Sequence, residues 1–300
     1  MDSSLLRMLQ SMKRIEDDPS RHFQTKTIDL ATFVPKYPNV MIVDQSIHPS
    51  RLLRRDFPYI ENIPPTIAST AAGPTQYKYL TNTLGSALVL PIGSGRGARA
   101  RTQAAKMSKP GAVMRGWTII LKEGLYINPR QLVLCHSPDF SGIEIIGLND
   151  VRILFTEPRG VAGFAIAGKV TLNNVRIYDF RSPGHGLQAL KVGSVPVSDL
   201  EEQAAVEAVL IDVKIYAPTI QGLETEGASV SLEGCAITGC REGIMSKGSQ
   251  VQMTSSVISK NYLHGATMHD GSKFTATRSR FLGPNAVWVQ SDCDASIIGE

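Results

Sequence analysis

The sequence lacks any long apolar stretch. No run of about 18 consecutive apolar residues occurs in its 300 residues, whereas a helix needs roughly 20 of them to cross a bilayer. The N-terminus also lacks the apolar segment of a secretory signal peptide. We therefore expect an intracellular, cytoplasmic protein without membrane contact. Basic and serine residues near the N-terminus leave a mitochondrial location open, although the acidic residues 16–18 argue against a targeting peptide.

Cysteine is scarce, and its spacing excludes the usual metal and redox motifs. No two cysteines form a C-x-x-C pair, which is the spacing of structural zinc sites and thioredoxin-like motifs. Cys235 and Cys240 lie in one repeat of the pattern described next, where packed thiols are favoured over a disulfide. We expect no metal site and no cofactor. The four cysteines are Cys135, Cys235, Cys240 and Cys293.

A glycine followed by an apolar residue recurs through the second half of the chain. The pairs are Gly142-Ile143, Gly163-Phe164, Gly186-Leu187, Gly222-Leu223, Gly243-Ile244 and Gly265-Ala266, with Ala286-Val287 in the same place. Subtraction gives steps of 21, 23, 36, 21, 22 and 21 residues. A period near 21 residues predicts a solenoid. The long step indicates an insertion at about residues 193–207, with helical character over Asp199–Ala208.

Each repeat contains three short runs in which apolar and polar residues alternate, separated by turn residues. This alternation is typical of strands, and three such strands bury an apolar face only when the repeats stack at about 4.8 Å per coil. The predicted inward columns are Leu223/Ile244/Ala266/Val287, Val170/Val230/Val251/Phe274 and Ile177/Ile215/Ile237/Ile258/Phe281. The pattern predicts an all-β fold, a parallel β-helix.

The start of the repeats resembles a known group of proteins. Residues 116–126 read GWTIILKEGLY and are followed by GIEIIGLNDVRI and the coils just described. Residues 100–300 thus resemble the right-handed parallel β-helix of the pectin-lyase-like superfamily. The resemblance implies coils of about 21–23 residues. It does not select an activity, because this superfamily includes lyases, hydrolases, epimerases and non-enzymatic binding domains.

The N-terminal part divides into a helix and an arm. Residues 1–17 predict an amphipathic helix, which either packs on its own domain or docks on another chain. Residues 18–95 are broken by prolines and predict an extended, irregular arm, which either drapes over the β-helix or reaches a partner. The apolar stripe of the helix, whose docking candidates are Leu5, Met8 and Met12, contains Leu5, Met8, Leu9, Met12 and Ile15.

A basic segment at residues 96–116 precedes the β-helix of residues 117–300. Its cations are Arg96, Arg99, Arg101, Lys106, Lys109 and Arg115. Residues 1–116 carry 16 Lys+Arg against 8 Asp+Glu, and the rest carries 15 against 19, so a basic part precedes an acidic body. The segment either caps the first coil or binds RNA or an acidic protein surface. No aromatic residue interrupts the cations, which argues against base stacking.

The outward face of the first strand column carries the residues with catalytic potential. Glu224 and Glu226 are two apart on one strand, about 7 Å, which is compatible with an inverting acid/base pair. His269 is a further acid/base candidate, and Trp288 could stack on a sugar. The simpler interpretation is a polar outer face in which Glu226 pairs with Lys247 on the next coil. Alternation predicts that this face contains Gln188, Glu224, Glu226, Met245, Lys247, Thr267, His269, Trp288 and Gln290.

The sequence lacks a complete set of catalytic motifs. Gly184-His185-Gly186 is similar to a tripeptide of polygalacturonases, but the accompanying aspartate motifs and the Arg-x-Lys of that family are absent.

The last residues have the pattern of an inner repeat, which predicts a β-helix end that is continued or covered by another surface. We therefore predict a non-catalytic β-helix scaffold, a subunit of a larger protein or ribonucleoprotein assembly. It would contact its partners through the arm, the basic segment and that end. The alternative is a carbohydrate-active enzyme or polysaccharide-binding protein.

Overall fold

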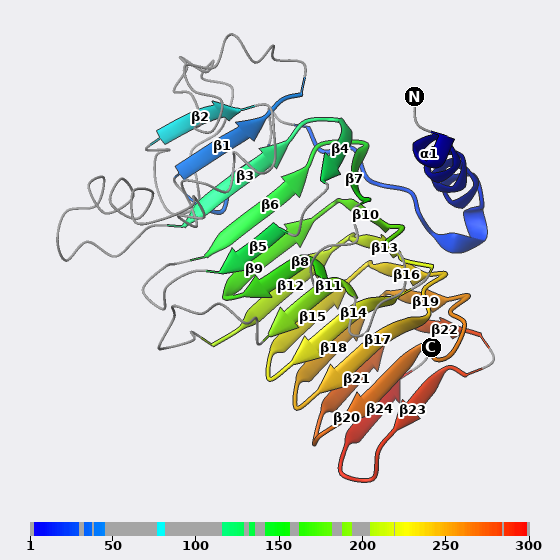
Figure 1. Cartoon of the computed structure of the whole chain (residues 1–300). Helices are drawn as coiled ribbons and strands as arrows, with labels where there is room; N and C mark the ends of the chain where they lie inside the picture. The colour runs from blue at the N-terminus through cyan, green and yellow to red at the C-terminus, as the bar shows by residue number, and fades with distance from the viewer. Residues whose placement is uncertain are drawn as a thin grey trace, which may run out of the picture.

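The chain folds into stacked coils of short parallel strands. The computed structural model describes residues 3–29, 33–37, 39–45, 77–81, 116–128, 132–135, 142–156, 162–181, 188–193, 205–218, 220–283 and 285–298. Every strand pair among these residues is parallel, and the strands form three long sheets that run along the stack (Figure 1). The fold is the predicted right-handed parallel β-helix with an N-terminal arm.

Three sheets form the walls of the β-helix. Sheet 1 contains, in spatial order, β2 (Tyr77–Thr81), β1 (Asn39–Val43), β3 (Trp117–Leu121), β6 (Ile143–Gly147), β9 (Lys169–Asn173), β12 (Glu207–Ile211), β15 (Ser229–Glu233), β18 (Gln250–Thr254), β21 (Lys273–Thr277) and β24 (Asp294–Ile298). Sheet 2 contains β22 (Arg280–Leu282), β19 (Val257–Ser259), β16 (Ala236–Thr238), β13 (Lys214–Tyr216), β10 (Arg176–Asp179), β7 (Val151–Phe155) and β4 (Gly124–Asn128). Sheet 3 contains β23 (Val287–Val289), β20 (Ala266–His269), β17 (Glu242–Lys247), β14 (Gln221–Glu226), β11 (Gln188–Gly193), β8 (Ala162–Ala167) and β5 (Leu132–Cys135).

The strand registers confirm the three predicted inward columns. In sheet 3, Leu223 pairs with Ile244 and Ile244 with Ala266. In sheet 1, Val230 pairs with Val251, and the same column continues through Ala208. These side chains belong to one continuous core cluster. Burying each aliphatic side chain contributes roughly 1.5–3 kcal/mol, so the columns are the main source of stability.

The recurring glycine of the repeat has a steric cause. A Cβ atom on any of the four glycines would lie closer than 3.0 Å to a backbone carbonyl oxygen of the following coil. Real Cβ atoms do not approach an oxygen that closely, so the close stacking of the coils selects glycine there. The four positions are Gly163, Gly222, Gly243 and Gly265.

The structure places two of the glycine pairs differently from the prediction. Leu223 pairs with Leu190, three residues after the predicted Leu187, and Leu187 itself lies outside the described residues. Ile143 pairs with Val170 and therefore belongs to sheet 1, not to the column of Phe164 in sheet 3. Glycines precede apolar residues at several places in a coil, so the pair alone does not identify the strand.

The insertion is only partly described. The predicted helical character over Asp199–Ala208 is wrong at its end, because residues 207 and 208 begin strand β12. Backbone pairing with β9 and β15 on both sides holds these residues in the sheet and overrides their helical propensity. The preceding residues 194–204 lie outside the described part of the chain.

The arm contributes strands to the β-helix. Strand β1 pairs with β3 on one side and with β2 on the other, so sheet 1 begins before residue 117. The outer strand β2 lies within the segment predicted to be an irregular arm. Its residues are separated from β1 by more than thirty positions, and no local pattern signals that pairing.

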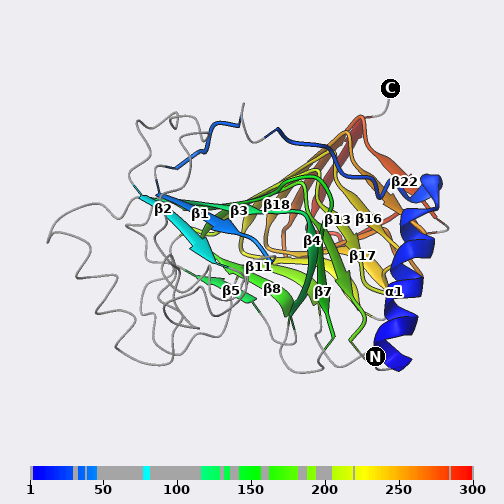
Figure 2. The same cartoon turned by 90° about the horizontal axis from the view of Figure 1, so that it is seen from above.

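The N-terminal helix α1 (Ser3–Glu16) packs on sheet 2 of its own chain (Figure 2). Met12 and Ile15 are buried in a cluster with Leu154 and Tyr178. Of the other residues predicted to dock on another chain, Leu5 is partly buried against the same cluster and Met8 is half-buried. The apolar stripe of α1 is therefore used within the chain.

The described part of the arm lies along the β-helix. After the short 3-10 helix η1 (Pro19–Arg21), the chain returns to sheet 1, where the Lys36 amide donates to Glu144 Oε2 at 3.1 Å. The Tyr37 amide donates to Thr118 Oγ1 at 3.0 Å. The Tyr37 ring lies where a side chain on residue 116 would be, so Gly116 makes room for it. These residues therefore drape over the β-helix, which is the first of the two courses predicted for the arm.

Docking of the arm should depend on pH through Glu144. Burial raises the pKa of this carboxyl above its ordinary value, although hydrogen bonds from Lys36 and Thr118 act in the opposite direction. A carboxyl with a raised pKa in the folded state contributes stability below its unfolded pKa and loses it as pH rises through the folded pKa. We expect wild type to lose stability relative to Glu144→Gln as pH rises above the ordinary pKa of a glutamate. Urea unfolding at several pH values measures this, and a difference that stays constant would contradict it.

Two further predictions concern membrane contact and the role of the cysteines. Within the described residues, no helix is long and apolar enough to cross a membrane. Cys235 and Cys240 are free thiols that belong to the apolar core, which confirms their predicted packing role. Burial raises the pKa of each thiol to about 12, so both are unreactive at neutral pH.

Candidate functional site

The outward face of sheet 3 brings together the predicted catalytic candidates and Trp288. Lys191, Glu224, Met245, Thr267 and Trp288 follow one another in register on five successive strands. A second outward column, two residues further along each strand, contains Glu226, Lys247 and His269. We call the residues Lys191, Glu224, Glu226, Lys247, His269 and Trp288 the sheet 3 strip.

Glu224 is held on several sides within this strip. Its Oε1 atom lies 3.6 Å from Lys191 Nζ and 3.2 Å from Lys247 Nζ. The side-chain amide of Gln188 donates to Oε2. Only 4% of Glu224 is exposed. The prediction of an outward residue is thus correct, but the residue is buried and its oxygens already have partners.

Glu226 has a different partner from the predicted one. It lies beside Lys247 in the register, yet its carboxylate pairs with Lys191 Nζ at 2.8 Å. Lys247 instead reaches the more deeply buried Glu224. Long lysine side chains can reach a diagonal neighbour in a sheet, and the attraction between opposite charges is stronger where water is excluded.

The ion pairs do not fit the requirements of an acid/base pair. An inverting glycosidase needs one carboxyl that delivers a proton and one carboxylate that activates water, each open to the substrate. Here Glu224 is buried and paired with both Lys191 and Lys247, and one oxygen of Glu226 is paired with Lys191. The arrangement resembles a structural charge cluster.

His269 and Trp288 form the other end of the strip. Their ring centroids are 5.0 Å apart, and His269 Nδ1 lies 3.3 Å from Gln290 Oε1. Trp288 is 44% exposed and presents an aromatic surface to solvent. The planes of the two rings are tilted by 46°, and the exposed indole is a binding feature more than a catalytic one.

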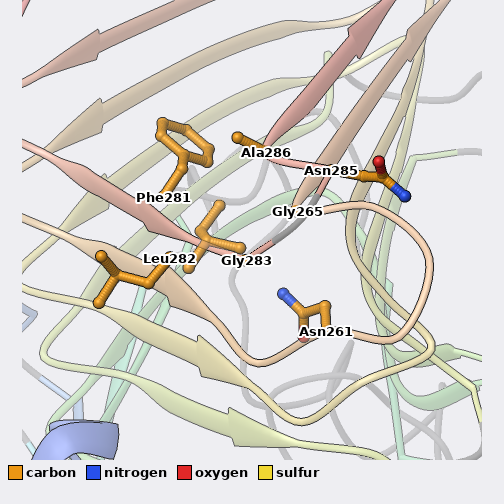
Figure 3. A pocket seen from close by; sticks show the side chains of 8 residues that line it. Asn261, Gly265, Phe281, Leu282, Gly283, Asn285 and Ala286 are labelled. Atoms are coloured by element: carbon orange, nitrogen blue, oxygen red, sulfur yellow. The ribbon is translucent and has the colours of Figure 1, made fainter.

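A small hollow lies between β19, β22 and β23 (Figure 3). Its water-accessible volume is about 10 Å³, room for about one water molecule. The buried Nδ2 of Asn261 has no hydrogen-bond partner, whereas its Oδ1 accepts from the Cys240 amide. The hollow is too small for a sugar. It is lined by Ile258, Asn261, Gly265, Phe281, Leu282, Gly283, Asn285 and Ala286.

A buried ion pair that the sequence did not predict supports the strip from behind. Arg181 Nη2 lies 2.6 Å from Asp179 Oδ2, and the two residues are 2% and 0% exposed. The same Nη2 donates to the carbonyl oxygen of Gln188. Burial raises the pKa of Asp179, and the Arg181 guanidinium opposes that rise. A polar path therefore runs from Asp179 through Arg181 and Gln188 to Glu224.

Other predicted sites are not described. All six cations of the basic segment, from Arg96 to Arg115, lie outside the described residues. In the part of the chain that the structure describes, no group of three or more His, Cys, Asp or Glu side chains is placed to hold a metal ion.

No protein-family model, curated protein or solved structure matches this chain.

Proposed function

We propose that this chain is a non-catalytic β-helix of the pectin-lyase-like type that acts as a binding subunit of a larger assembly. The observation that carries the proposal is the ion pairing of Glu224 and Glu226 with Lys191 and Lys247. These contacts occupy the two carboxylates that catalysis would require.

Exposed apolar side chains support a binding role. Five large apolar residues on the last three strands are between 39% and 55% exposed. They lie on three different sheets of one coil, and exposed apolar surface is typical of protein interfaces. The basic segment would add contacts with RNA or with an acidic protein surface. The five residues are Leu282, Trp288, Val289, Ile297 and Ile298.

The mass of the native particle tests this proposal. The chain alone has a mass of 32.5 kDa. When it is purified gently from its own cells, light scattering after size exclusion should give a discrete, larger mass with partners in fixed stoichiometry. A monodisperse particle of the mass of one chain would contradict the proposal.

A polysaccharide-binding role is the second candidate, and the exposed ring of Trp288 favours it. His269, which contacts Trp288, lies next to Lys247 in the register. Lys247 in turn lies next to Glu226, and the side chains of both are partly exposed. Aromatic rings flanked by polar groups are suited to sugars, which present both apolar and hydroxyl faces.

The contribution of Trp288 to such binding can be measured directly. If the strip binds a polysaccharide, Trp288→Ala should weaken retention on the immobilised polymer about tenfold, because stacking contributes about 1 kcal/mol or more. Tyr262→Ala is the control, since Tyr262 is exposed but lies off sheet 3. Equal retention of both variants and wild type would exclude the strip as a sugar site.

A further inference from the structure

We propose that His22 is an acid-sensitive latch, which holds the start of the arm against the β-helix while its imidazole is neutral and releases it on protonation. The part of the arm that the latch holds is residues 18–26, which we call the latch segment. It includes η1 and passes beside strand β22 of the last coil (Figure 2).

The contact between His22 and Arg280 requires a neutral imidazole. His22 Nε2 lies 3.2 Å from Arg280 Nη2. A guanidinium group has hydrogen-bond donors only, so Nε2 accepts this bond and the ring proton lies on Nδ1. A protonated imidazole carries a hydrogen on both nitrogens and accepts no bond. Protonation of His22 therefore breaks the contact and leaves two cations facing each other.

The other charges near His22 increase this repulsion. Lys214 on strand β13 is a second cation that acts on His22, and it is only 6% exposed. The nearby acids Asp18 and Asp212 are engaged by other cations, so they do not offset a charge on His22. These ion pairs are Asp18 with Arg21 at 3.1 Å, Asp18 with Lys260 at 2.8 Å and Asp212 with Lys26 at 2.6 Å.

The direction of the pH effect follows from these contacts. Burial, Arg280 and Lys214 lower the pKa of His22 below its ordinary value. The imidazole therefore binds its proton more tightly when the segment is released, and protonation favours release. The latch is closed above the ordinary pKa of histidine, about 6.5, and weakens as pH falls below it. The hydrogen bond from Lys260 lowers the pKa of Asp18, so this carboxylate stays charged in that range.

Contacts that do not titrate near neutral pH hold the rest of the latch segment. Phe23 is completely buried, and its ring centroid lies 5.4 Å from that of Tyr178. The Asn174 side chain accepts from the Lys26 amide at 2.9 Å and donates to the Lys26 carbonyl oxygen at 2.7 Å. Release breaks these contacts and exposes apolar surface on sheet 2. The chain would thus present a different surface at acidic pH.

Hydrogen exchange of the Lys26 amide measures the latch in the full-length chain. We expect its protection factor to fall about threefold or more between about pH 7.5 and about pH 5.5. His22→Gln keeps a neutral side chain and should remove this dependence, whereas His22→Lys should lower the protection at every pH. Arg280→Gln should weaken the dependence. The matched control is His269→Gln on sheet 3, which should keep the wild-type profile.

An NMR titration of the imidazole tests the same latch without reference to opening. We expect the His22 proton on Nδ1 at neutral pH and a pKa below that of histidine in a peptide, which rises toward the peptide value in Arg280→Gln. A proton on Nε2, or a pKa equal to the peptide value, would overturn the proposal. An equal fall of Lys26 protection in wild type and His22→Gln would also overturn it, because another group would then be responsible.

Discussion

Replacing Gly243 with alanine is expected to lower the free energy of unfolding by about 3 kcal/mol. The added methyl group would lie closer than 3.0 Å to the carbonyl oxygen of Gly265. That oxygen accepts a hydrogen bond from the Ile244 amide at 2.9 Å and is fixed in the ladder between two coils. The coils must therefore separate locally, which strains the pairing on both sides.

Gly283→Ala is the matched control for this substitution. No atom lies within 4 Å of a Cβ built on Gly283, so alanine should change stability by less than about 1 kcal/mol. Equilibrium unfolding in guanidinium measures both variants. If the two substitutions cost the same, the contact between coils is not the reason for the glycine repeat.

Replacing Arg181 with methionine should have the second large effect, a loss of about 3–5 kcal/mol. The substitution keeps most of the side-chain volume but leaves the carboxylate of Asp179, which is completely buried, without its counter-ion. It also removes the hydrogen bond to the Gln188 carbonyl oxygen. An uncompensated buried charge costs far more than the loss of an exposed pair.

A second substitution and a change of pH identify the cause of this loss. Asp179→Asn combined with Arg181→Met should recover much of the stability, because no charge then remains buried. The loss in Arg181→Met alone should shrink as pH falls, since protonation of Asp179, whose pKa burial already raises, neutralises it. Lys122→Met, which breaks the partly exposed pair with Asp44, should cost less than about 1 kcal/mol. A loss in Arg181→Met that is independent of pH would contradict the electrostatic explanation.

The inward columns were predictable because their period is regular. Val230, Val251 and Phe274 recur at 21 and 23 residues and pair in the predicted register. Alternation within a strand then assigns every neighbour to the inside or the outside. In a fold built from one repeated packing unit, the same residue pattern occurs in several coils. A single residue that departs from the pattern therefore does not prevent its recognition.

Prediction failed where the repeat is interrupted. The coil that contains the insertion has its inward residue at Leu190, and the earlier glycine-leucine pair at residues 186 and 187 suggested a register three residues away. As a consequence, Lys191 was not recognised as the neighbour of Glu224. Strand β2 was also missed, because its pairing with β1 depends on distant residues.

The chemistry of the site was less predictable than its location. Alternation placed Glu224 on the outer face, but it carries no information on what covers that face, and the residue proved buried. The choice of Lys191 as partner of Glu226, in preference to Lys247, depends on side-chain rotamers. Asp179 and Arg181 gave no signal because charged residues next to a turn usually lie in solvent.

Glu224→Gln tests the central claim, that the carboxylates of the sheet 3 strip are structural. Glutamine keeps the shape of the side chain but cannot compensate the charges of Lys191 and Lys247. The account predicts a loss of about 1–3 kcal/mol in the free energy of unfolding, with no change in the products formed from a panel of polysaccharides. A variant as stable as wild type that has lost cleavage of a polymer which wild type cleaves would contradict it.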